Sequence, residues 1–435
     1  MLIDKIKSKH AKIGVIGMGY VGLPVAVAFA EKGFRVTGFD VVKARVSQLN
    51  RGESYIGDIP SERLLPLNAS GCFHATYDFS VLAAQDVIII AVPTPLNQTR
   101  DPDLTAIKAA TRNIAAYLQK GQLVVLESTT YPGTTEEVLQ PILEEKGFKV
   151  GQDFYLAFSP ERIDPGSNSS KGWCFENTPK VVGGVTPACL EAATSLYGQV
   201  IEKVVPVSSA RVAEMCKLFE NTFRVVNVAL VNEMALLCDR MGLNVWEVLD
   251  AASTKPYGFM KFTPGPGVGG HCIPVDPFYL TWKAREFDFN TRFIELAGEI
   301  NLQMPRYVRE LVMRALNTHG KSLKGSRVLL LGVAYKKDVA DMRETPAIRV
   351  IELLEKDGAQ VSYHDPHVPQ FEENHLKMSS IELSAEALAE ADCVVLVTDH
   401  SAYDYNFIVS NARLLVDTRN ATLNVNEGRE KITLL

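Results

Sequence analysis

The sequence lacks the apolar segments that mark membrane and secreted proteins. Its longest strongly apolar run, Val87 to Val92, falls far short of the roughly 20 residues that a membrane-spanning helix needs. The amino-terminal stretch MLIDKIKSKHAK is charged throughout and has none of the apolar core of a signal peptide. We therefore expect a cytoplasmic protein without a membrane partner.

The sequence also has few cysteines and no excess of positive charge. The 435 residues include only seven cysteines, and no pair of them has the spacing of a zinc site, so we expect neither a metal centre nor a disulfide framework. Lysine and arginine total 45 against 51 acidic residues, which gives a net charge of −6. This charge argues against a nucleic-acid partner, although a local basic pocket for a phosphorylated ligand is compatible with it.

What the sequence does contain begins with an alternation of short apolar strands and helical stretches. The length suggests two or three domains at roughly 150 residues each. Strands built almost wholly of apolar residues are typical of a parallel sheet that helices cover on both faces. The strands expected in the first part are 12–16, 34–39, 86–92, 123–126 and 154–158.

The middle of the chain holds an unusually long helical pattern. From Ser209 to Met241 there is no glycine or proline, whereas typical globular helices run roughly 8–20 residues. Ser208 or Ser209 can cap its start, and Gly242 fits its end. A helix of this length is expected to connect two lobes, and it can also carry a dimer interface.

The last part repeats the pattern of the first. DVIIIAVPTP from Asp86 is matched by DCVVLVTDH from Asp392, and LVVLEST from Leu123 by LLVDTRN from Leu414. Strands of α/β proteins can look alike by chance, but the shared order favours an α/β fold with two Rossmann-like doubly wound lobes joined by a long central helix. Further strands are expected at 327–332 and 360–363 and a helix at 346–356. The expected domains are residues 1–206, 207–320 and 321–435.

The first strand leads into a glycine-rich turn. Residues 17–22 read GMGYVG, which is the G-x-G-x-x-G pattern after an expected strand and before an expected helix, as the dinucleotide-binding motif requires. Gly17, Gly19 and Gly22 would let the backbone approach a pyrophosphate, whose charge the helix amino terminus stabilises. Tyr20 and Val21 belong to the same turn. The alternative is a glycine turn without a ligand.

Asp40 indicates which dinucleotide binds. It ends the second strand about twenty residues after the turn, where a carboxylate can accept hydrogen bonds from a ribose 2′-hydroxyl and would repel a 2′-phosphate. We therefore expect NAD as the cofactor, although nearby Lys43 and Arg45 leave NADP open. The last lobe lacks this fingerprint, since its first strand ends in GVAYKK from Gly332. A nucleotide there would be bound differently, with basic side chains near the phosphates.

Glu214, Lys217, Asn221 and Arg224 share one face of the long helix because they recur at helical spacing. A polar stripe on a helix is commonly its solvated side. The functional alternative directs an ammonium and an amide, those of Lys217 and Asn221, at a reacting oxygen. Such donors can stabilise the alkoxide that develops when an alcohol is oxidised without zinc.

Residues 264–276, PGPGVGGHCIPVD, form the most unusual segment of the chain. So many glycines and prolines fix a backbone path rather than a core element, and Cys272 lies within it. A thiolate there could add to an aldehyde, and the adduct could give up hydride to form a thioester. Water would then release an acid, with Asp276 or Glu161 as base. An inert buried cysteine is the alternative, and His271 could be only a surface residue.

Two further polar loops follow strands of the first lobe, at the edge where α/β sheets bind ligands. They are residues 127–133, ESTTYPG, and residues 159–166, SPERIDPG. Their hydroxyls and carboxylates could hold water or substrate. Helix capping is the alternative for Ser128 and Thr129.

Together these motifs resemble the UDP-glucose/GDP-mannose dehydrogenase family over nearly the whole chain. The resemblance implies an oxidoreductase that oxidises the C6 alcohol of a nucleotide sugar to a carboxylate, with two hydride transfers to NAD. It also implies two Rossmann-like lobes, one for NAD and one for the UDP-sugar, joined by a long helix that forms a homodimer. The motifs that carry it are GMGYVGLP, AVPTP from Ala91, CKLFEN from Cys216, GGHCIPVD from Gly269 and YKKDVADMRE from Tyr335.

The resemblance also implies roles at the matching positions. Cys272 matches the nucleophile and Asp276 its supporting carboxylate. Lys217 and Asn221 match the pair at the reacting oxygen, and Glu161 matches the general base for thioester hydrolysis. The other matches are Thr129 for a catalytic water, Thr94 and Arg343 for the cofactor, Gly269, Tyr335 and Lys336 for the UDP-sugar, and Arg419 for the substrate of the partner subunit.

Departures from the UDP-glucose enzymes indicate a different sugar. Pro165 stands where those enzymes carry a second glutamate, Lys255 where they have an arginine that reaches the neighbouring site, and Arg224 where they have an apolar residue. These features resemble the branch that acts on UDP-N-acetylhexosamines, whose acetamido carbonyl could be held by Arg162, Arg224 or Lys255. We expect UDP-N-acetylglucosamine as substrate, for surface polysaccharide synthesis. The alternatives are UDP-N-acetylgalactosamine, UDP-N-acetylmannosamine and UDP-glucose.

Two other classes of function compete with this one. A one-step dehydrogenase of β-hydroxyacid type would share the first lobe and a Lys/Asn pair on a helix, but it would need neither Cys272 nor a second α/β lobe. A non-catalytic NAD-binding protein would need none of the set Lys217, Asn221, Cys272 and Asp276, so the presence of all four argues against it.

Overall fold

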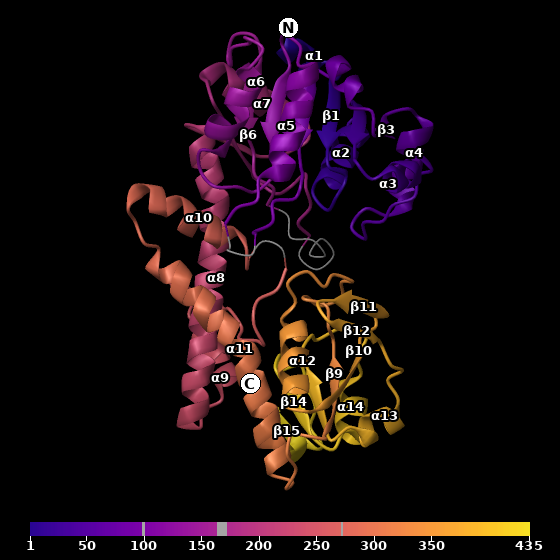
Figure 1. Ribbon diagram of the computed structural model, residues 1–435, viewed down its shortest axis with the longest axis vertical. Coiled ribbons are helices and arrows are strands. Elements are labelled where there is room, and N and C mark those ends of the chain that lie inside the picture. The colour runs from indigo at the N-terminus through magenta and orange to yellow at the C-terminus, as the bar shows by residue number, and fades with distance from the viewer. Residues whose placement is uncertain (98–100, 163–171, 271–272) are drawn as a thin grey trace. The chain divides into compact units, whose positions relative to one another are not determined.

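The computed structural model describes residues 1–97, 101–162, 172–270 and 273–435. These residues form two compact units, Met1–Glu220 with Trp282–Phe289 and Asn221–Thr281 with Asn290–Leu435. Each unit is built on its own large sheet (Figure 1). Within the described ranges, no helix combines the length and the apolar character that a membrane span requires. The three domain boundaries expected from the sequence remain a prediction.

The first unit contains an eight-stranded sheet in the order β3-β2-β1-β4-β5-β6-β7-β8. Strands β1 to β6 run parallel, as expected, but β7 pairs antiparallel with β6, and β8 pairs parallel with β7. The expectation of a wholly parallel sheet is therefore wrong at its far edge. The strands are β1 (Lys12–Ile16), β2 (Arg35–Phe39), β3 (Phe73–Thr76), β4 (Val87–Ile90), β5 (Leu123–Leu126), β6 (Tyr155–Phe158), β7 (Lys180–Gly184) and β8 (Val204–Val207).

Strands β4 and β5 are buried at every residue, so helices must cover both faces of this sheet. Buried residues of α2 and α7 form one apolar cluster with strand residues that include Ile13, Val87 and Leu123. The buried residues of α5 lie outside that cluster, and α5 packs with α6. The helices are α1 (Leu2–Lys7), α2 (Gly22–Glu31), α3 (Lys43–Asn50), α4 (Ser61–Ala69), α5 (Thr105–Tyr117), α6 (Gln140–Glu144) and α7 (Pro187–Tyr197), with the short turns η1 (Phe79–Ala84) and η2 (Thr135–Leu139).

Helix α8 (Ala210–Met241) begins in the first unit and continues in the second. At its start, Ser209 Oγ accepts a hydrogen bond from the Val212 N–H at 3.3 Å. After its end, Gly242 has a φ of +70°, the left-handed conformation that commonly follows a helix. The structure therefore confirms the long helix, its serine cap and its glycine stop.

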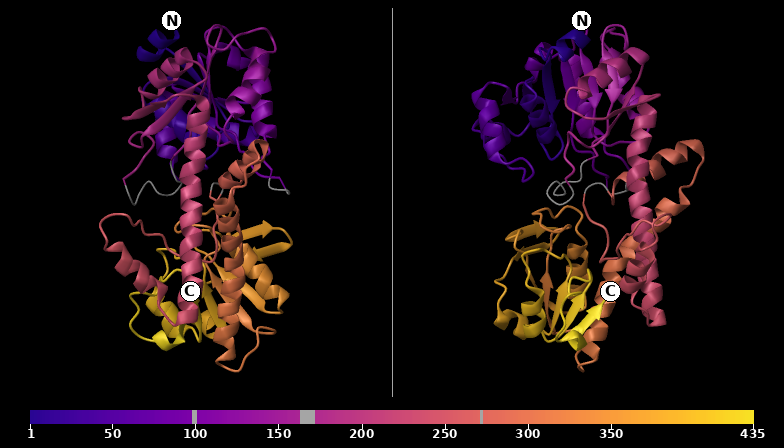
Figure 2. Two further views of the ribbon diagram at one scale, coloured as in Figure 1. Left: turned by 90° about the vertical axis from the view of Figure 1, so that its left-hand side faces the viewer. Right: turned by 180° about the vertical axis from the view of Figure 1, so that it is seen from behind.

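The second unit combines long helices with a five-stranded sheet. In Figure 2, α8 and α11 lie side by side, and buried Asn232 and Asn301 share a hydrogen bond of 2.9 Å between them. Helix α12 packs against α11, and both contribute to one apolar core with β9 and β13. The remaining helices are α9 (Val245–Ser253), α10 (Asp276–Ala284), α11 (Arg292–Asn317), α12 (Pro346–Lys356), α13 (Ala385–Glu390) and α14 (Tyr405–Asn411), with η3 (Arg285–Phe287) and η4 (Arg429–Lys431). The strands are β9 (Arg327–Leu331), β10 (Gln360–His364), β11 (Gln370–Glu373), β12 (Leu376–Ser379), β13 (Cys393–Leu396), β14 (Leu415–Asp417) and β15 (Ile432–Leu434).

The two large sheets repeat one plan. The second has the parallel order β10-β9-β13-β14-β15, so β13 and β14 occupy the places that β4 and β5 hold beside β1. Asp86, before β4, accepts a hydrogen bond from the Lys12 N–H at 2.9 Å. Asp392, before β13, accepts one from the Arg327 N–H at 2.9 Å. The sequence likeness around Asp86 and Asp392 therefore reflects equivalent positions, and the prediction of two Rossmann-like lobes is confirmed.

Candidate active site

The glycine-rich turn between β1 and α2 is shaped for close approach of a ligand. A Cβ atom on Gly17, whose φ is +95°, would lie 2.4 Å from Ala91 O, and one on Gly22 would lie 1.8 Å from Gly17 O. Around the Cβ position of Gly19, no described atom lies within 4 Å. Gly17 therefore allows the tight turn, Gly22 allows the helix to pack closely on the strand, and Gly19 leaves space for a pyrophosphate to approach the backbone.

Asp40 borders this turn at the end of β2. Its carboxylate accepts hydrogen bonds from the Met18 N–H at 3.1 Å and the Val42 N–H at 2.9 Å, which fix its orientation. A 2′-phosphate would meet this oriented negative charge, whereas a 2′-hydroxyl could donate to it, so the residues fit NAD. The other cofactor contacts expected in this unit are Tyr20 (exposed), Val21 (half-buried) and Thr94 (buried).

The polar stripe of α8 is buried rather than solvated. Glu214, Lys217 and Asn221 are 0%, 8% and 3% exposed, and Arg224 is half-buried. Apolar Phe219 on the same helix is 65% exposed. The alternative that this stripe is the solvated side of the helix is therefore wrong, because its polar side chains are buried in the protein.

Glu214 ties α8 to the loop that follows β5. Its carboxylate accepts hydrogen bonds from the Gly133 N–H at 2.5 Å and from the N–H and hydroxyl of Thr135 at 2.9 and 2.7 Å. Burial raises the pKa of Glu214 to about 7, because the cost of burying charge outweighs these hydrogen bonds. The loop that carries half-buried Thr129 is thereby joined to the turn of α8 that precedes Lys217.

Asn221 and Asp276 meet in the second unit. Asn221 Nδ2 donates a hydrogen bond of 2.5 Å to the Asp276 carboxylate, and both side chains are buried. Asp276 is the first residue of α10, where the helix dipole favours a negative charge. The amide and the carboxylate that the sequence assigned to the reaction therefore lie together. Cys272 and His271 lie outside the described residues, so the position of the nucleophile remains a prediction.

The glycine-rich loop before Asp276 packs on the loop that follows β9. A Cβ atom on Gly269 would lie 2.8 Å from Tyr335 Cβ, and one on Gly270 would lie 2.9 Å from Tyr335 Cε2. Gly270 has a φ of +88°, a conformation in which glycine is the default residue. Tyr335 and neighbouring Lys336 are half-buried. The loop expected to contact the UDP portion is thus shaped partly by this glycine contact.

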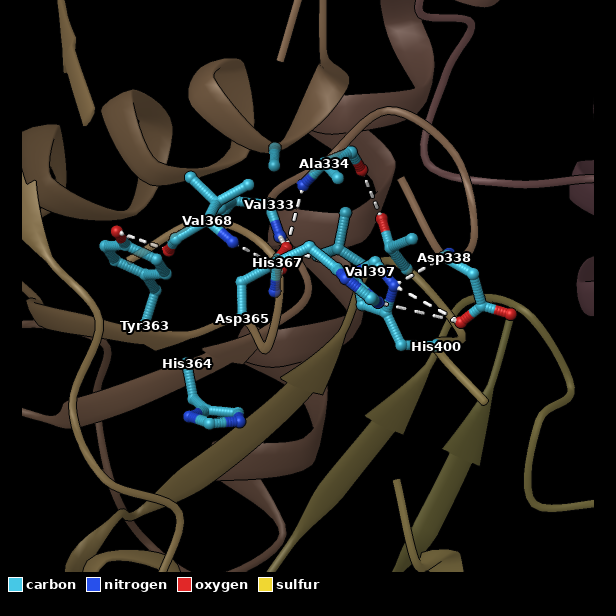
Figure 3. A network of polar contacts seen from close by, with 12 residues as sticks. Val333, Ala334, Asp338, Tyr363, His364, Asp365, His367, Val368, Val397 and His400 are labelled. Carbon is cyan, nitrogen blue, oxygen red and sulfur yellow. Dashed lines mark hydrogen bonds and ion pairs between the residues drawn. The ribbon is translucent and has the colours of Figure 1, made fainter. Parts of the chain in front are cut away.

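A polar network holds both ends of the loop after β9 (Figure 3). Asp365, after β10, accepts hydrogen bonds from the Val333 and Ala334 N–H groups at 2.7 and 3.0 Å. Buried His400 accepts one from the Asp338 N–H at 2.9 Å through Nδ1, and its Nε2 lies 3.1 Å from Asp365. Burial acts to raise the pKa of Asp365, but hydrogen bonds from His400 and the backbone outweigh it and lower the pKa to about 2.

Family models match the chain along most of its length. They describe the NAD binding domain (residues 11–201), the central domain (211–303) and the UDP binding domain (329–424) of the UDP-glucose/GDP-mannose dehydrogenase family. The chain belongs to this family. It is therefore an NAD-dependent nucleotide-sugar dehydrogenase, and the resemblance carried by its motifs is confirmed.

Individual relatives differ in the sugar that their names give. The UDP-N-acetyl-D-glucosamine 6-dehydrogenase of Pseudomonas aeruginosa is 36% identical over 94% of each chain. The UDP-N-acetyl-D-mannosamine dehydrogenase of Escherichia coli (strain K12) is 36% identical, over 90% of this chain and 94% of its own. Among solved structures, the UDP-D-ManNAc dehydrogenase of Pyrococcus horikoshii has a TM-score of 0.87 at 33% identity, and the match covers 97% of this chain and 98% of that one.

Three arginines of the expected dehydrogenase site are held by protein groups. Their partners are Glu220 for Arg162 (2.6 Å), Asp341 for Arg343 (2.6 Å) and the Val397 carbonyl for Arg419 (2.9 Å). These contacts orient the guanidinium groups before any ligand arrives. Lys255 is exposed, and its ammonium lies 5.1 Å from the centre of the Tyr257 ring.

Sequence reasoning missed a buried group of charges beside Glu161. Lys180 Nζ lies 3.4 Å from the carboxylates of Glu127 and Glu161, and the Tyr197 hydroxyl donates to Glu127. A single lysine at the start of an apolar strand gives no sign in the sequence that it is buried. Its position depends on the direction of β7, which local sequence does not determine. The roles of Asp365 and His400 were missed for a similar reason, since three strand ends must come together to reveal them.

The pKa of Glu214 predicts that the first unit loses stability as pH rises. Because the folded-state pKa of about 7 exceeds the ordinary value of 4.5, the folded protein holds this proton more tightly. The stabilisation is complete below about pH 4.5 and is lost as pH rises through 7. Relative to Glu214→Gln, we expect the free energy of unfolding of the wild type to fall by about 2 kcal/mol from pH 5 to pH 8, as measured by urea denaturation. Glu191→Gln, at an exposed position, serves as control. Equal pH dependence in wild type and Glu214→Gln would contradict the prediction.

Proposed function

We propose that this enzyme oxidises the C6 alcohol of UDP-N-acetylglucosamine to the carboxylate in two NAD-dependent steps, through a thioester on Cys272. The observation that carries the proposal is the buried hydrogen bond between Asn221 of α8 and Asp276 of α10. Lys217, which is also buried, lies one turn before Asn221 on α8. Burying an ammonium, an amide and a carboxylate costs free energy, and a catalytic role would account for their presence. Their residue types match what the two oxidations require.

In the first step, the Lys217 ammonium and the Asn221 amide stabilise the oxygen of the alcohol as its proton leaves. The glycine turn would hold NAD, which would accept the hydride that leaves the sugar carbon, with one NAD consumed in each of the two oxidations. In the second step, the Cys272 thiolate adds to the aldehyde carbon, and loss of a second hydride from the adduct forms a thioester. Asp276 supports the charges at this centre. Thr129 holds the water that cleaves the thioester, and Glu161 accepts its proton.

The choice of sugar rests on basic side chains and on the relatives. Arg162, Arg224 and Lys255 could hold an acetamido carbonyl, which UDP-glucose lacks. Relatives at 36% identity are named for both UDP-N-acetylglucosamine and UDP-N-acetylmannosamine. UDP-N-acetylmannosamine is therefore the second candidate, and UDP-N-acetylgalactosamine differs from the first only at C4. The acid would serve the synthesis of surface polysaccharide.

A parallel assay of four UDP-sugars tests the substrate. We expect kcat/KM for UDP-N-acetylglucosamine to exceed that for UDP-glucose at least tenfold, a difference of about 1.4 kcal/mol, with the uronic acid identified by mass. Free N-acetylglucosamine should not react, because it lacks the UDP group that the UDP-binding lobe would bind. Cys272→Ala should abolish acid formation, whereas a one-step dehydrogenase would keep its activity. Preference for UDP-N-acetylmannosamine would overturn the substrate assignment and leave the mechanism intact.

We also infer that the enzyme is a homodimer formed through α8. One exposed row of side chains on this helix is apolar, and Phe219, at 65% exposure, is its most exposed member. Spacings of three, four and seven residues put these side chains on one helical seam, as in helices that pack on one another, and apolar seams of this kind mark interaction surfaces. The seam consists of Val212, Met215, Phe219, Phe223, Leu230, Leu237 and Met241.

The double variant Leu230→Glu/Leu237→Glu tests the homodimer. Each substitution would bury a carboxylate in the seam, so we expect the molar mass by light scattering to fall from that of a dimer, or a larger assembly, to that of one 47.9 kDa chain. Lys356→Glu, at the exposed end of α12, adds negative charge elsewhere and should leave the mass unchanged. A monomeric wild type would refute the proposal.

A further inference from the structure

Lys180 reaches the carboxyl edge of the first sheet because β7 runs against β6. The register pairs Ala157 with Gly184 and Phe158 with Gly183, and the same register continued beyond β6 puts Glu161 opposite Lys180. If β7 ran parallel to β6, its first residue would lie at the opposite edge, far from the loops that follow β5 and β6. The antiparallel direction of β7 therefore places the Lys180 ammonium at the edge of the sheet where ligands bind.

The surroundings of Lys180 hold its ammonium between two carboxylates. Nζ lies 3.4 Å from an oxygen of Glu127, 3.4 Å from an oxygen of Glu161 and 3.4 Å from the Pro160 carbonyl oxygen. On the other side of Glu127, the Tyr197 hydroxyl donates a hydrogen bond to its second oxygen. Lys180, Glu127 and Tyr197 are buried, whereas the Glu161 side chain keeps 13% exposure. Of the two carboxylates, only that of Glu161 can therefore meet a ligand.

The buried charges around Lys180 cost more free energy than a purely structural element requires. Two carboxylates share one ammonium in a buried place, and burial raises the pKa of Glu127. Apolar side chains of similar volume commonly give a protein equal or greater stability than a buried ion pair. The rings of Phe175 and Tyr197, whose centres lie 5.0 and 5.1 Å from Nζ, leave little room for water to screen the charges. A function at Glu161 explains why the charges are there.

We propose that Lys180, backed by Glu127 and Tyr197, is the positioning residue that aims the Glu161 carboxylate at the water that hydrolyses the thioester. The inference rests on the proposed function, in which Glu161 is the base. In that step the water oxygen bonds to the thioester carbon and its proton passes to Glu161. The carbon–sulfur bond then breaks, and the sulfur of Cys272 leaves as thiolate. An ammonium held 3.4 Å from the Glu161 carboxylate limits the directions in which that carboxylate can point.

Lys180→Met tests the proposal through the step that it slows. Both hydride transfers precede hydrolysis, so the variant should release two NADH per active site rapidly and then turn over at least tenfold more slowly than the wild type. Mass spectrometry of the quenched protein should find the acyl-enzyme accumulated on Cys272. A fall in kcat without acyl-enzyme, or no fall at all, would overturn the proposal.

Two further variants separate positioning from folding. Glu127→Gln/Lys180→Met removes the buried charges in equal number and should fold, as judged by NADH binding, but should still accumulate acyl-enzyme. Recovery of wild-type kcat in this double variant would mean that Lys180 only neutralises Glu127. Lys283→Met removes another buried lysine with two glutamate partners, Glu137 and Glu286, and should accumulate no acyl-enzyme. If the wild type itself forms no acid, the proposed function fails rather than the role of Lys180.

Discussion

Burial of the polar side of α8 is the constraint on which the site depends. A helix of 32 residues that turns Glu214, Lys217 and Asn221 inward must satisfy each of these groups inside the protein. Glu214 takes three hydrogen bonds from the loop after β5, and Asn221 donates to Asp276 at the start of α10. Each contact fixes a segment that carries another expected site residue. The same helix leaves a row of apolar side chains exposed, and we expect a second copy of the chain to cover it.

The two lobes show how one chain plan can be used in two ways. In the first, the turn after β1 is open at Gly19, and Asp40 is oriented at the border of that space. In the second, Asp365 occupies the equivalent place after β10, but it is taken up by the backbone of the loop after β9 and by His400. Asp40 also accepts hydrogen bonds from backbone N–H groups, but Asp365 is held in addition by buried His400, so its carboxylate serves mainly to shape the loop. The absence of the glycine fingerprint from the second lobe agrees with this difference.

Local sequence predicted those parts of the fold that local forces determine. β1, β5 and α12 were expected at the residues where they occur, and α8 was expected with its serine cap and glycine stop, because apolar periodicity and capping are written within each segment. The direction of β7 and the β11–β12 hairpin were missed. Strand direction depends on contacts between segments distant in sequence, as the pairing of Phe158 with Gly183 illustrates. The same limit applies to the site: residue types marked Lys217, Asn221 and Asp276, but nothing local marked Lys180 or His400.

The central claim is a four-electron oxidation through a covalent intermediate, and the ratio of NADH to sugar tests it most directly. A limiting amount of UDP-N-acetylglucosamine would be consumed to completion with excess NAD, and NADH would be read by absorbance against the sugar consumed. The account predicts two NADH per sugar and no free aldehyde. One NADH per sugar with a stable aldehyde would contradict it, because a single oxidation needs neither the thioester nor the base that these loops are proposed to hold.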